Sequence, residues 1–120
     1  MSHERVLKAL VSLGLSRRAA EVYVYLATKG PQKTADIAST LKLKKQQELY
    51  SALKNLQEKR IVRATLNYSA HYSALPFEKA IDLLLEVKRK DAQNIEQNRE
   101  EILSEWHSII SDSSETQLDR

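Results

Sequence analysis

One stretch in the middle of the chain carries polar and basic side chains of the types that read DNA. It supplies seven such residues: Lys44, Lys45, Gln46, Gln47, Tyr50, Ser51 and Lys54. A glutamine amide can pair bidentately with adenine in the major groove, whereas lysines neutralise phosphates. Gln47, Ser51 and Lys54 follow one another at spacings of four and three, so they share one face if the stretch is helical. On an isolated helix this pattern is more typical of a solvated polar face, so the neighbouring elements must decide between the two interpretations.

The surrounding sequence predicts the elements that would present this face to DNA. Apolar spacing predicts a short helix over residues 34–41, a tight turn and a longer helix over residues 44–59. The longer helix would bury Leu49, Ala52, Leu53 and Leu56. Residues 61–66 and 71–75 alternate as strands do, and residues 67–70 form the turn between them. This order predicts a helix-turn-helix followed by a two-stranded wing, with helix 44–59 able to enter a major groove.

Two more helices are predicted ahead of this motif. The first, over residues 4–13, ends at Gly14, where a left-handed conformation is favourable. The second, over residues 17–29, follows Ser16 as its N-cap and stops at the Gly-Pro pair 30–31. The predicted fold class is therefore mainly α (α+β), a winged helix-turn-helix.

Six residues outside helix 44–59 are weaker candidates for contact with the DNA backbone or a groove edge. They are Arg17, Arg18, Thr34, Arg63, Asn67 and His71. Thr34 is also the expected N-cap of helix 34–41. Arg17 and Arg18 open a predicted helix, where phosphate oxygens can meet backbone amides, but a surface pair without a role fits nearly as well. Arg63 is the only Lys or Arg of the wing, so the sequence leaves open whether the wing contacts DNA.

The last third of the chain predicts one long helix after the winged helix-turn-helix of residues 1–76. It runs over residues 77–112, and we expect a disordered tail over residues 113–120. Isoleucines recur along it at multiples of seven residues, and other large apolar residues lie beside them. The predicted seam consists of Ile81, Leu84, Leu85, Ile95, Ile102, Trp106 and Ile109. A seven-residue period is typical of a helix that pairs with another helix, so we predict a coiled-coil-like homodimer.

Charge is divided unevenly along the chain. Residues 1–76 hold 13 Lys and Arg against 5 Asp and Glu, a balance of +8. Residues 77–120 hold 6 against 11, a balance of −5, and the two add to the net charge of +3. A basic N-terminal part followed by an acidic C-terminal part indicates a domain that binds a polyanion, joined to an extension of opposite charge.

No constellation in the sequence points to an enzyme. Cysteine is absent, which excludes disulfides and thiolate metal sites, and the three histidines are isolated from one another. Neither a glycine-rich phosphate loop nor a nucleophile elbow occurs. We therefore expect no catalytic activity, no metal and no cofactor, and the sequence indicates no effector. No apolar run approaches the roughly 18 residues of a membrane span, and the N-terminus lacks a signal-peptide pattern, so we expect a cytoplasmic protein without a membrane partner.

Four segments carry a resemblance to a known family. They are LVSLGLSRRAAEVYVYLATKGP, TADIASTLKL, ELYSALKNLQEKRIV and HYSALP, the last just before the long helix. With them the chain resembles, over roughly residues 7–105, the N-terminal DNA-binding part of archaeal TrmB-family transcription regulators. The resemblance implies a DNA-binding winged helix.

Three departures from the family pattern matter. Arg60 stands where members usually have Gly, which is expected to cost about 1 kcal/mol if that position is left-handed. The turn at Lys44-Lys45 lacks the usual Ser, Thr or Pro. Larger members also carry a C-terminal sugar-binding effector domain. Because this sequence ends at Arg120, we expect no such domain, and sugar sensing is not carried over.

The hypothesis from sequence is sequence-specific binding of double-stranded DNA by a homodimer that regulates transcription. A two-fold dimer would bind a pseudo-palindromic site. Two alternatives keep the same fold. A winged helix can serve as a protein–protein interaction module, which would show no salt-sensitive affinity for DNA. It can also coat DNA without sequence preference, which would show a steep salt dependence alone.

Overall fold

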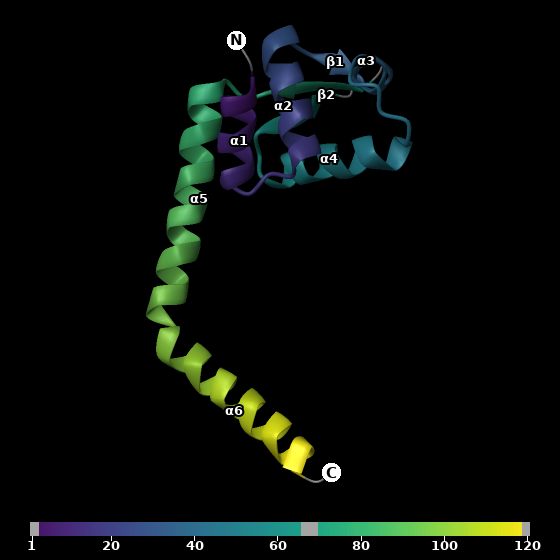
Figure 1. Ribbon diagram of the computed structural model, residues 1–120. Helices are drawn as coiled ribbons and strands as arrows, with labels where there is room; N and C mark the ends of the chain where they lie inside the picture. The colour runs from purple at the N-terminus through teal and green to yellow at the C-terminus, as the bar shows by residue number, and fades with distance from the viewer. Residues whose placement is uncertain (1–2, 66–69, 119–120) are drawn as a thin grey trace. The chain divides into compact units, whose positions relative to one another are not determined.

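The computed structural model describes residues 3–65 and 70–118 as helices, short strands and their connections (Figure 1). In chain order the elements are α1 (Glu4–Ser12), α2 (Arg17–Lys29), β1 (Gln32–Lys33), α3 (Thr34–Thr40), α4 (Gln46–Glu58), β2 (Val62–Thr65), β3 (His71–Ala74), α5 (Phe77–Gln97) and α6 (Arg99–Leu118). The chain forms two units, residues 1–85 and residues 86–120. The winged helix-turn-helix fold expected from the sequence is confirmed in the first unit.

A shared core holds α1 to α5 together in the first unit. Its largest fully buried side chains come from every one of these helices and from the residue just before β2: Leu10, Val22, Tyr23, Leu26, Ile37, Leu49, Leu53, Leu56, Ile61 and Leu84. Burying each such side chain stabilises the fold by about 1.5–3 kcal/mol. The unit extends past the predicted boundary at residue 76 because Ala80 and Leu84 of α5 lie in this core.

Three helices of the first unit end in the same way. After α1, α3 and α4 the next residue but one is left-handed: Gly14 at φ 111°, Lys42 at φ 55° and Arg60 at φ 63°. Around Arg60 the Ile61 amide donates to the Leu56 carbonyl at 3.2 Å, and the Arg60 amide donates to Gln57 at 3.0 Å. These are the two hydrogen bonds of a Schellman motif. The left-handed conformation considered for Arg60 is therefore present.

The starts of α3 and α4 differ from the sequence-based expectation. Thr34 is the first residue of α3 and Lys33 is its N-cap, so the assignment of Thr34 as N-cap was wrong. α4 begins at Gln46, two residues later than predicted, because Lys45 has an extended conformation and its side chain makes no cap hydrogen bond. Ser16 was predicted correctly, since its Oγ accepts a hydrogen bond from the Ala19 amide at 3.0 Å.

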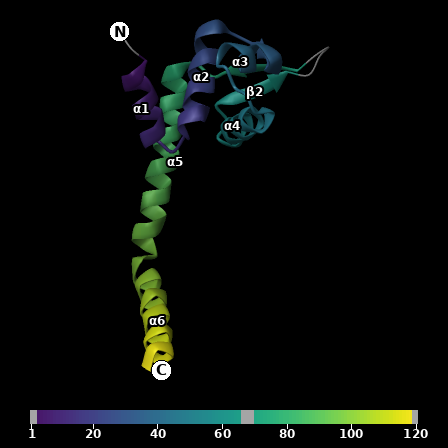
Figure 2. The same cartoon turned by 45° about the vertical axis from the view of Figure 1, so that its right-hand side comes forward.

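The wing is part of a three-stranded antiparallel sheet in the order β1-β3-β2. Strands β2 and β3 were predicted, whereas β1 was not, because two residues are too short to show a periodic pattern. β1 pairs Gln32 with Tyr72 and Lys33 with His71. Figure 2 shows β2 beside α4, which it contacts. Of the expected turn over residues 67–70, residues 67–69 lie outside the described residues.

The predicted long helix is divided in two. α5 ends at Gln97 and α6 begins at Arg99, with Asn98 between them. The Nδ2 of Asn98 donates to the backbone carbonyl of Asn94 at 2.9 Å, and an asparagine that bonds to nearby backbone in this way competes with the helical hydrogen-bond ladder. α6 continues as a helix through residues 113–118, where we expected a disordered tail.

Two members of the predicted dimer seam pack on their own chain instead. Leu84 is 2% exposed and Ile81 packs against the same core. The assignment of Leu84 to a dimer interface was therefore wrong, because the heptad pattern cannot distinguish a partner chain from the winged-helix core that the first turns of α5 meet.

Candidate nucleic-acid interface

α4 has one buried face and one exposed face. Its buried face consists of Leu49, Ala52, Leu53 and Leu56. Its exposed face carries the predicted DNA-contacting residues Gln46, Gln47, Tyr50, Ser51 and Lys54. The helical periodicity that anchors α4 in the core thus leaves five polar or basic side chains accessible from outside.

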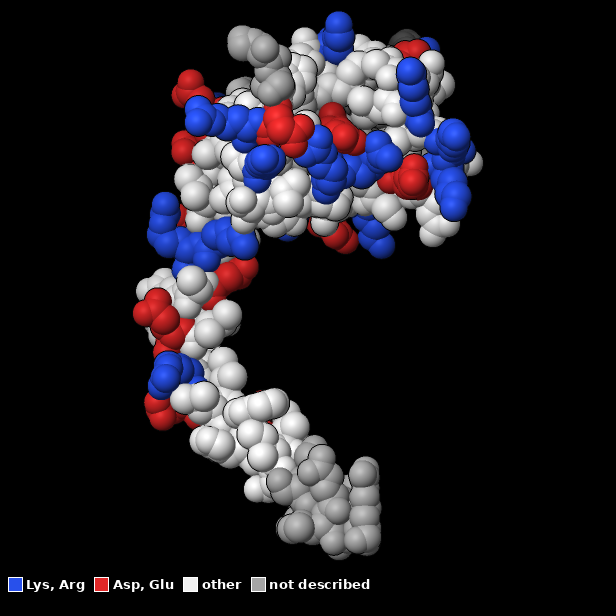
Figure 3. Space-filling view, viewed as in Figure 1, with Lys and Arg blue, Asp and Glu red and all other residues white. Residues whose placement is uncertain are grey.

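A lysine-rich turn precedes α4. Lys44 and Lys45 were expected on the helix but lie in the connection between α3 and α4, and Lys42 lies there as well. All three side chains are exposed. Figure 3 shows Lys and Arg side chains gathered at the right-hand end of the winged-helix unit, where Figure 1 shows this connection. Because the N-terminus of a helix also attracts anions, the turn is well suited to contact phosphates.

The two glutamines of α4 differ in their surroundings. The Nε2 of Gln46 donates to the Tyr50 hydroxyl oxygen at 3.1 Å, so Gln46 and Tyr50 form a pair on the helix surface. Within the described residues, Gln47 makes no hydrogen bond with its side chain. Gln47 therefore keeps its whole amide for an incoming partner, whereas one of the two amide N–H groups of Gln46 is already engaged.

A shallow cavity of about 600 Å³ lies between the start of α2 and α4. Its lining includes four predicted residues, which the fold brings together from two helices and the turn: Arg18, Lys45, Gln47 and Ser51. Asn55 also lines it, and the Oδ1 of this residue is buried without a hydrogen-bond partner among the described residues. The cavity therefore combines hydrogen-bonding groups with two basic side chains and one carboxylate, that of Glu48.

Arg17 and Arg18 are engaged with carboxylates of their own chain. Arg17 contacts Glu4 at 2.6 Å and Glu21 at 3.5 Å, and Arg18 contacts Glu21 at 2.8 Å. The hydrogen bond from Arg17 lowers the pKa of Glu4, and the same bond raises the pKa of Arg17. Sequence reasoning could not find the Arg17–Glu4 pair, because the packing of α1 on α2 brings these two residues together, whereas Glu21 lies three and four residues from its partners on α2 itself. These ion pairs reduce the positive charge that the start of α2 offers to phosphate.

The remaining weaker candidates lie on the sheet and on α3. Arg63 is exposed on β2, whereas His71 is half-buried at the start of β3, opposite Lys33 and Thr65. Thr34 is half-buried at the start of α3, and Asn67 lies outside the described residues. Of these residues, Arg63 is the one that the structure leaves most open to a partner.

Metal-binding and membrane-spanning features were also sought. Within residues 3–65 and 70–112, whose side chains the structure describes, no three His, Asp or Glu side chains gather as a metal site would require. None of the helices in the same residues is both long enough and apolar enough to cross a bilayer.

One comparison with a solved structure agrees with this fold. In solved structures, the chain is similar to a MarR-family transcriptional regulator from Silicibacter pomeroyi, with a TM-score of 0.53, 21% identity and coverage of 88% of this chain and 77% of that one. It also matches a mutant form of ZitR from Lactococcus lactis, with a TM-score of 0.49, 21% identity and coverage of 82% and 75%. No curated protein matches the sequence.

The family comparison goes further. Residues 10–78 match the family described as "Sugar-specific transcriptional regulator TrmB". These 69 residues, counted from 10 to 78, are more than half of the 120-residue chain. They run from the end of α1 through the whole winged helix to the start of α5. The protein belongs to the TrmB family of transcriptional regulators.

Proposed function

We propose that this protein binds double-stranded DNA sequence-specifically as a homodimer and thereby regulates transcription. α4 enters the major groove in this proposal, and the lysine-rich turn before it contacts phosphates. The observation that carries the proposal is the division of α4 into a buried apolar face and an exposed face with Gln47, Ser51 and Lys54. This arrangement lets the helix touch bases without leaving the core.

Electrostatics support the phosphate contacts. The first 76 residues carry a balance of +8, and Lys42, Lys44 and Lys45 are exposed within four consecutive positions. Lysines at such positions release counterions from DNA when they neutralise phosphates, so affinity falls as salt rises. This contribution fixes the position of the helix but carries no sequence information.

Gln47 is our candidate for reading the base sequence. Its amide can accept from N6 and donate to N7 of adenine. Gln46 is less suited, because one of its two amide N–H groups is already directed to Tyr50. Ser51 lies one turn further along the same face and lines the same cavity as Gln47, so it is placed to contact a neighbouring base or phosphate.

Apolar side chains of the second unit support a homodimer. Ile95 is 59% exposed, and α6 adds further exposed large residues. These are Ile102, Trp106, Ile109 and Ile110. Figure 3 shows a face of α6 that is almost free of charged side chains. Burying this row against the same row of a second copy removes it from water. The interface then consists of residues 95–110, together with the exposed Leu85, while Leu84 serves the core.

The proposal has a direct test in the substitution Gln47→Ala. On the preferred duplex it is expected to weaken binding by about 1–3 kcal/mol, with little effect on random duplex. Gln57→Ala serves as the matched control, since Gln57 is exposed near the other end of α4. Fluorescence anisotropy with both duplexes at two salt concentrations measures the difference.

The outcomes separate the proposal from its alternatives. Equal losses of affinity on both duplexes in Gln47→Ala mean that Gln47 contacts the DNA backbone and does not read bases. A wild-type protein that prefers no sequence coats DNA non-specifically. A protein without salt-sensitive affinity for any duplex is a protein-interaction module. In the proposed role the protein acts in the cytoplasm, where it reaches the chromosome.

A further inference from the structure

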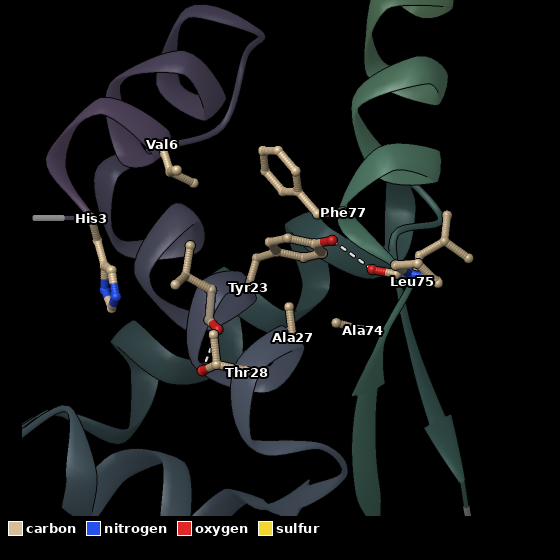
Figure 4. Close-up of a pocket in the computed structure, with 10 residues that line it drawn as sticks. His3, Val6, Tyr23, Ala27, Thr28, Ala74, Leu75 and Phe77 are labelled. Atoms are coloured by element: carbon tan, nitrogen blue, oxygen red, sulfur yellow. Dashed lines mark hydrogen bonds between the residues drawn. The ribbon is translucent and has the colours of Figure 1, made fainter. Parts of the chain in front are cut away.

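A cavity of about 490 Å³ lies on the first unit, apart from the residues proposed to contact DNA. Its ten lining residues come from the start of α1, from α2, and from the end of β3 through to the first residue of α5. Figure 4 shows Val6, Ala27, Ala74 and Phe77 among its lining residues, with the ring of Tyr23 between them. The volume is within the roughly 300–1,000 Å³ typical of small-molecule sites.

The walls of this cavity are apolar. The rings of Tyr23 and Phe77 lie with their centroids 6.5 Å apart, and six of the other eight lining residues are aliphatic, the exceptions being His3 and Thr28. Phe77 is 39% exposed although it is large and apolar. A ligand that covers this ring removes it from water, which favours binding.

Few polar groups are available inside. The Tyr23 hydroxyl donates to the Leu75 carbonyl at 2.5 Å, and the Thr28 hydroxyl donates to the Val24 carbonyl at 2.9 Å. Both protons are therefore committed to the protein itself. The lone pairs of Thr28 and the imidazole of His3 are left to face a ligand. The lining contains no Lys, Arg, Asp or Glu among the described residues.

This chemistry selects a class of ligand. A sugar needs many hydrogen-bond partners when it is buried, and an ion needs an opposite charge. The lining supplies neither. We infer that the cavity between α1, α2 and the start of α5 binds a small, neutral, aromatic or branched apolar molecule with one polar group directed at His3 and Thr28.

The position of the cavity suggests what such a ligand does. α2 packs both beside the cavity and against α4, and the Tyr23–Leu75 hydrogen bond joins α2 to the segment that leads into α5. A ligand held between these segments shifts α2, and α4 packs against α2. The position of α4 therefore changes, and with it the affinity of the protein for DNA. This last step rests on the proposed DNA binding, whereas occupation of the cavity does not.

The test uses the full-length protein without DNA and 2-naphthol as the probe. Isothermal titration calorimetry is expected to show binding of 2-naphthol, while glucose and the charged analogue 2-naphthalenesulfonate bind at least about tenfold more weakly. Ala27→Phe, which places a ring into the cavity from an exposed position of α2, is expected to weaken 2-naphthol binding by about tenfold or more. Ala9→Phe is the matched control, because Ala9 is exposed on α1 and does not line the cavity.

Three results would overturn the inference. The first is the absence of 2-naphthol binding to the wild type. The second is an Ala27→Phe variant that binds as well as the Ala9→Phe control. The third is an Ala27→Phe variant that dissociates into monomers in sedimentation, because the cavity then belongs to a contact between copies. Since none of these measurements involves DNA, they stand apart from a failure of the proposed DNA binding.

Discussion

Arg60→Gly is expected to stabilise the winged-helix unit. Arg60 has φ 63°, and a left-handed conformation costs a residue with a Cβ about 1–2 kcal/mol. Glycine removes this cost but loses about 0.4–1 kcal/mol through the greater freedom of the unfolded chain. The two hydrogen bonds of the Schellman motif join backbone atoms only, so they persist in the variant. The net gain is about 0.5–1 kcal/mol, or roughly 2–8 °C in Tm for a unit of this size.

The assay must report on the first unit alone. Trp106 lies in the second unit, so its fluorescence is unsuitable. Amide hydrogen exchange of core residues such as Leu53 gives the free energy of unfolding of the first unit directly. Glu58→Gly is the control, because Glu58 is an exposed helical residue of α4 and glycine there is expected to destabilise by about 0.5 kcal/mol. An Arg60→Gly variant that is no more stable than the wild type would refute the reasoning.

Three further predictions address charge, assembly and pH. Lys45→Ala and Lys54→Ala are each expected to weaken binding to all duplexes alike and to flatten the salt slope by about one unit; unchanged slopes in both would remove α4 from the interface. Replacing Ile95 and Ile102 together by Glu is expected to yield monomers in analytical ultracentrifugation, and a wild type that is itself monomeric at micromolar concentration would contradict the dimer. Burial raises the pKa of Tyr23 to about 12 from its ordinary value of 10.0. The folded state thus holds the Tyr23 proton more tightly than the unfolded state does. The resulting contribution to the free energy of unfolding is complete below pH 10 and is lost as the pH rises toward 12. Tyrosinate absorbance of the wild type and Tyr23→Phe measures it, and full ionisation of Tyr23 near pH 10 would be inconsistent with its burial.

Sequence pattern sufficed for elements whose signals are local. The cap at Ser16 and the apolar stripe of α4 follow from side chains within one or two turns of each other, so they could be predicted. For Arg60, comparison with the family pattern raised a left-handed conformation only as a condition, and the φ of 63° meets that condition.

Features that depend on distant contacts could not be predicted. β1 exists only because Gln32 and Lys33 meet β3, which lies far along the sequence at His71–Ala74. Leu84 has the same heptad position whether the long helix packs on a partner chain or on the winged-helix core. Only the fold shows that Leu84 packs in the core.

For the candidate site, the exposed face of α4 could be predicted from periodicity. The pairing of Arg17 with Glu4 and the hydrogen bond between Gln46 and Tyr50 required three-dimensional packing and side-chain conformation.

Selection of binding sites from a pool of random duplex DNA, repeated at two salt concentrations, tests sequence-specific binding most directly. The proposed function predicts enrichment of a pseudo-palindromic sequence whose half-sites lie about one helical turn, or a multiple of it, apart. It also predicts that the enrichment survives the higher salt and is lost in Gln47→Ala. Recovery of DNA without a shared sequence would contradict specific reading, and recovery of no DNA at either salt concentration would contradict DNA binding itself.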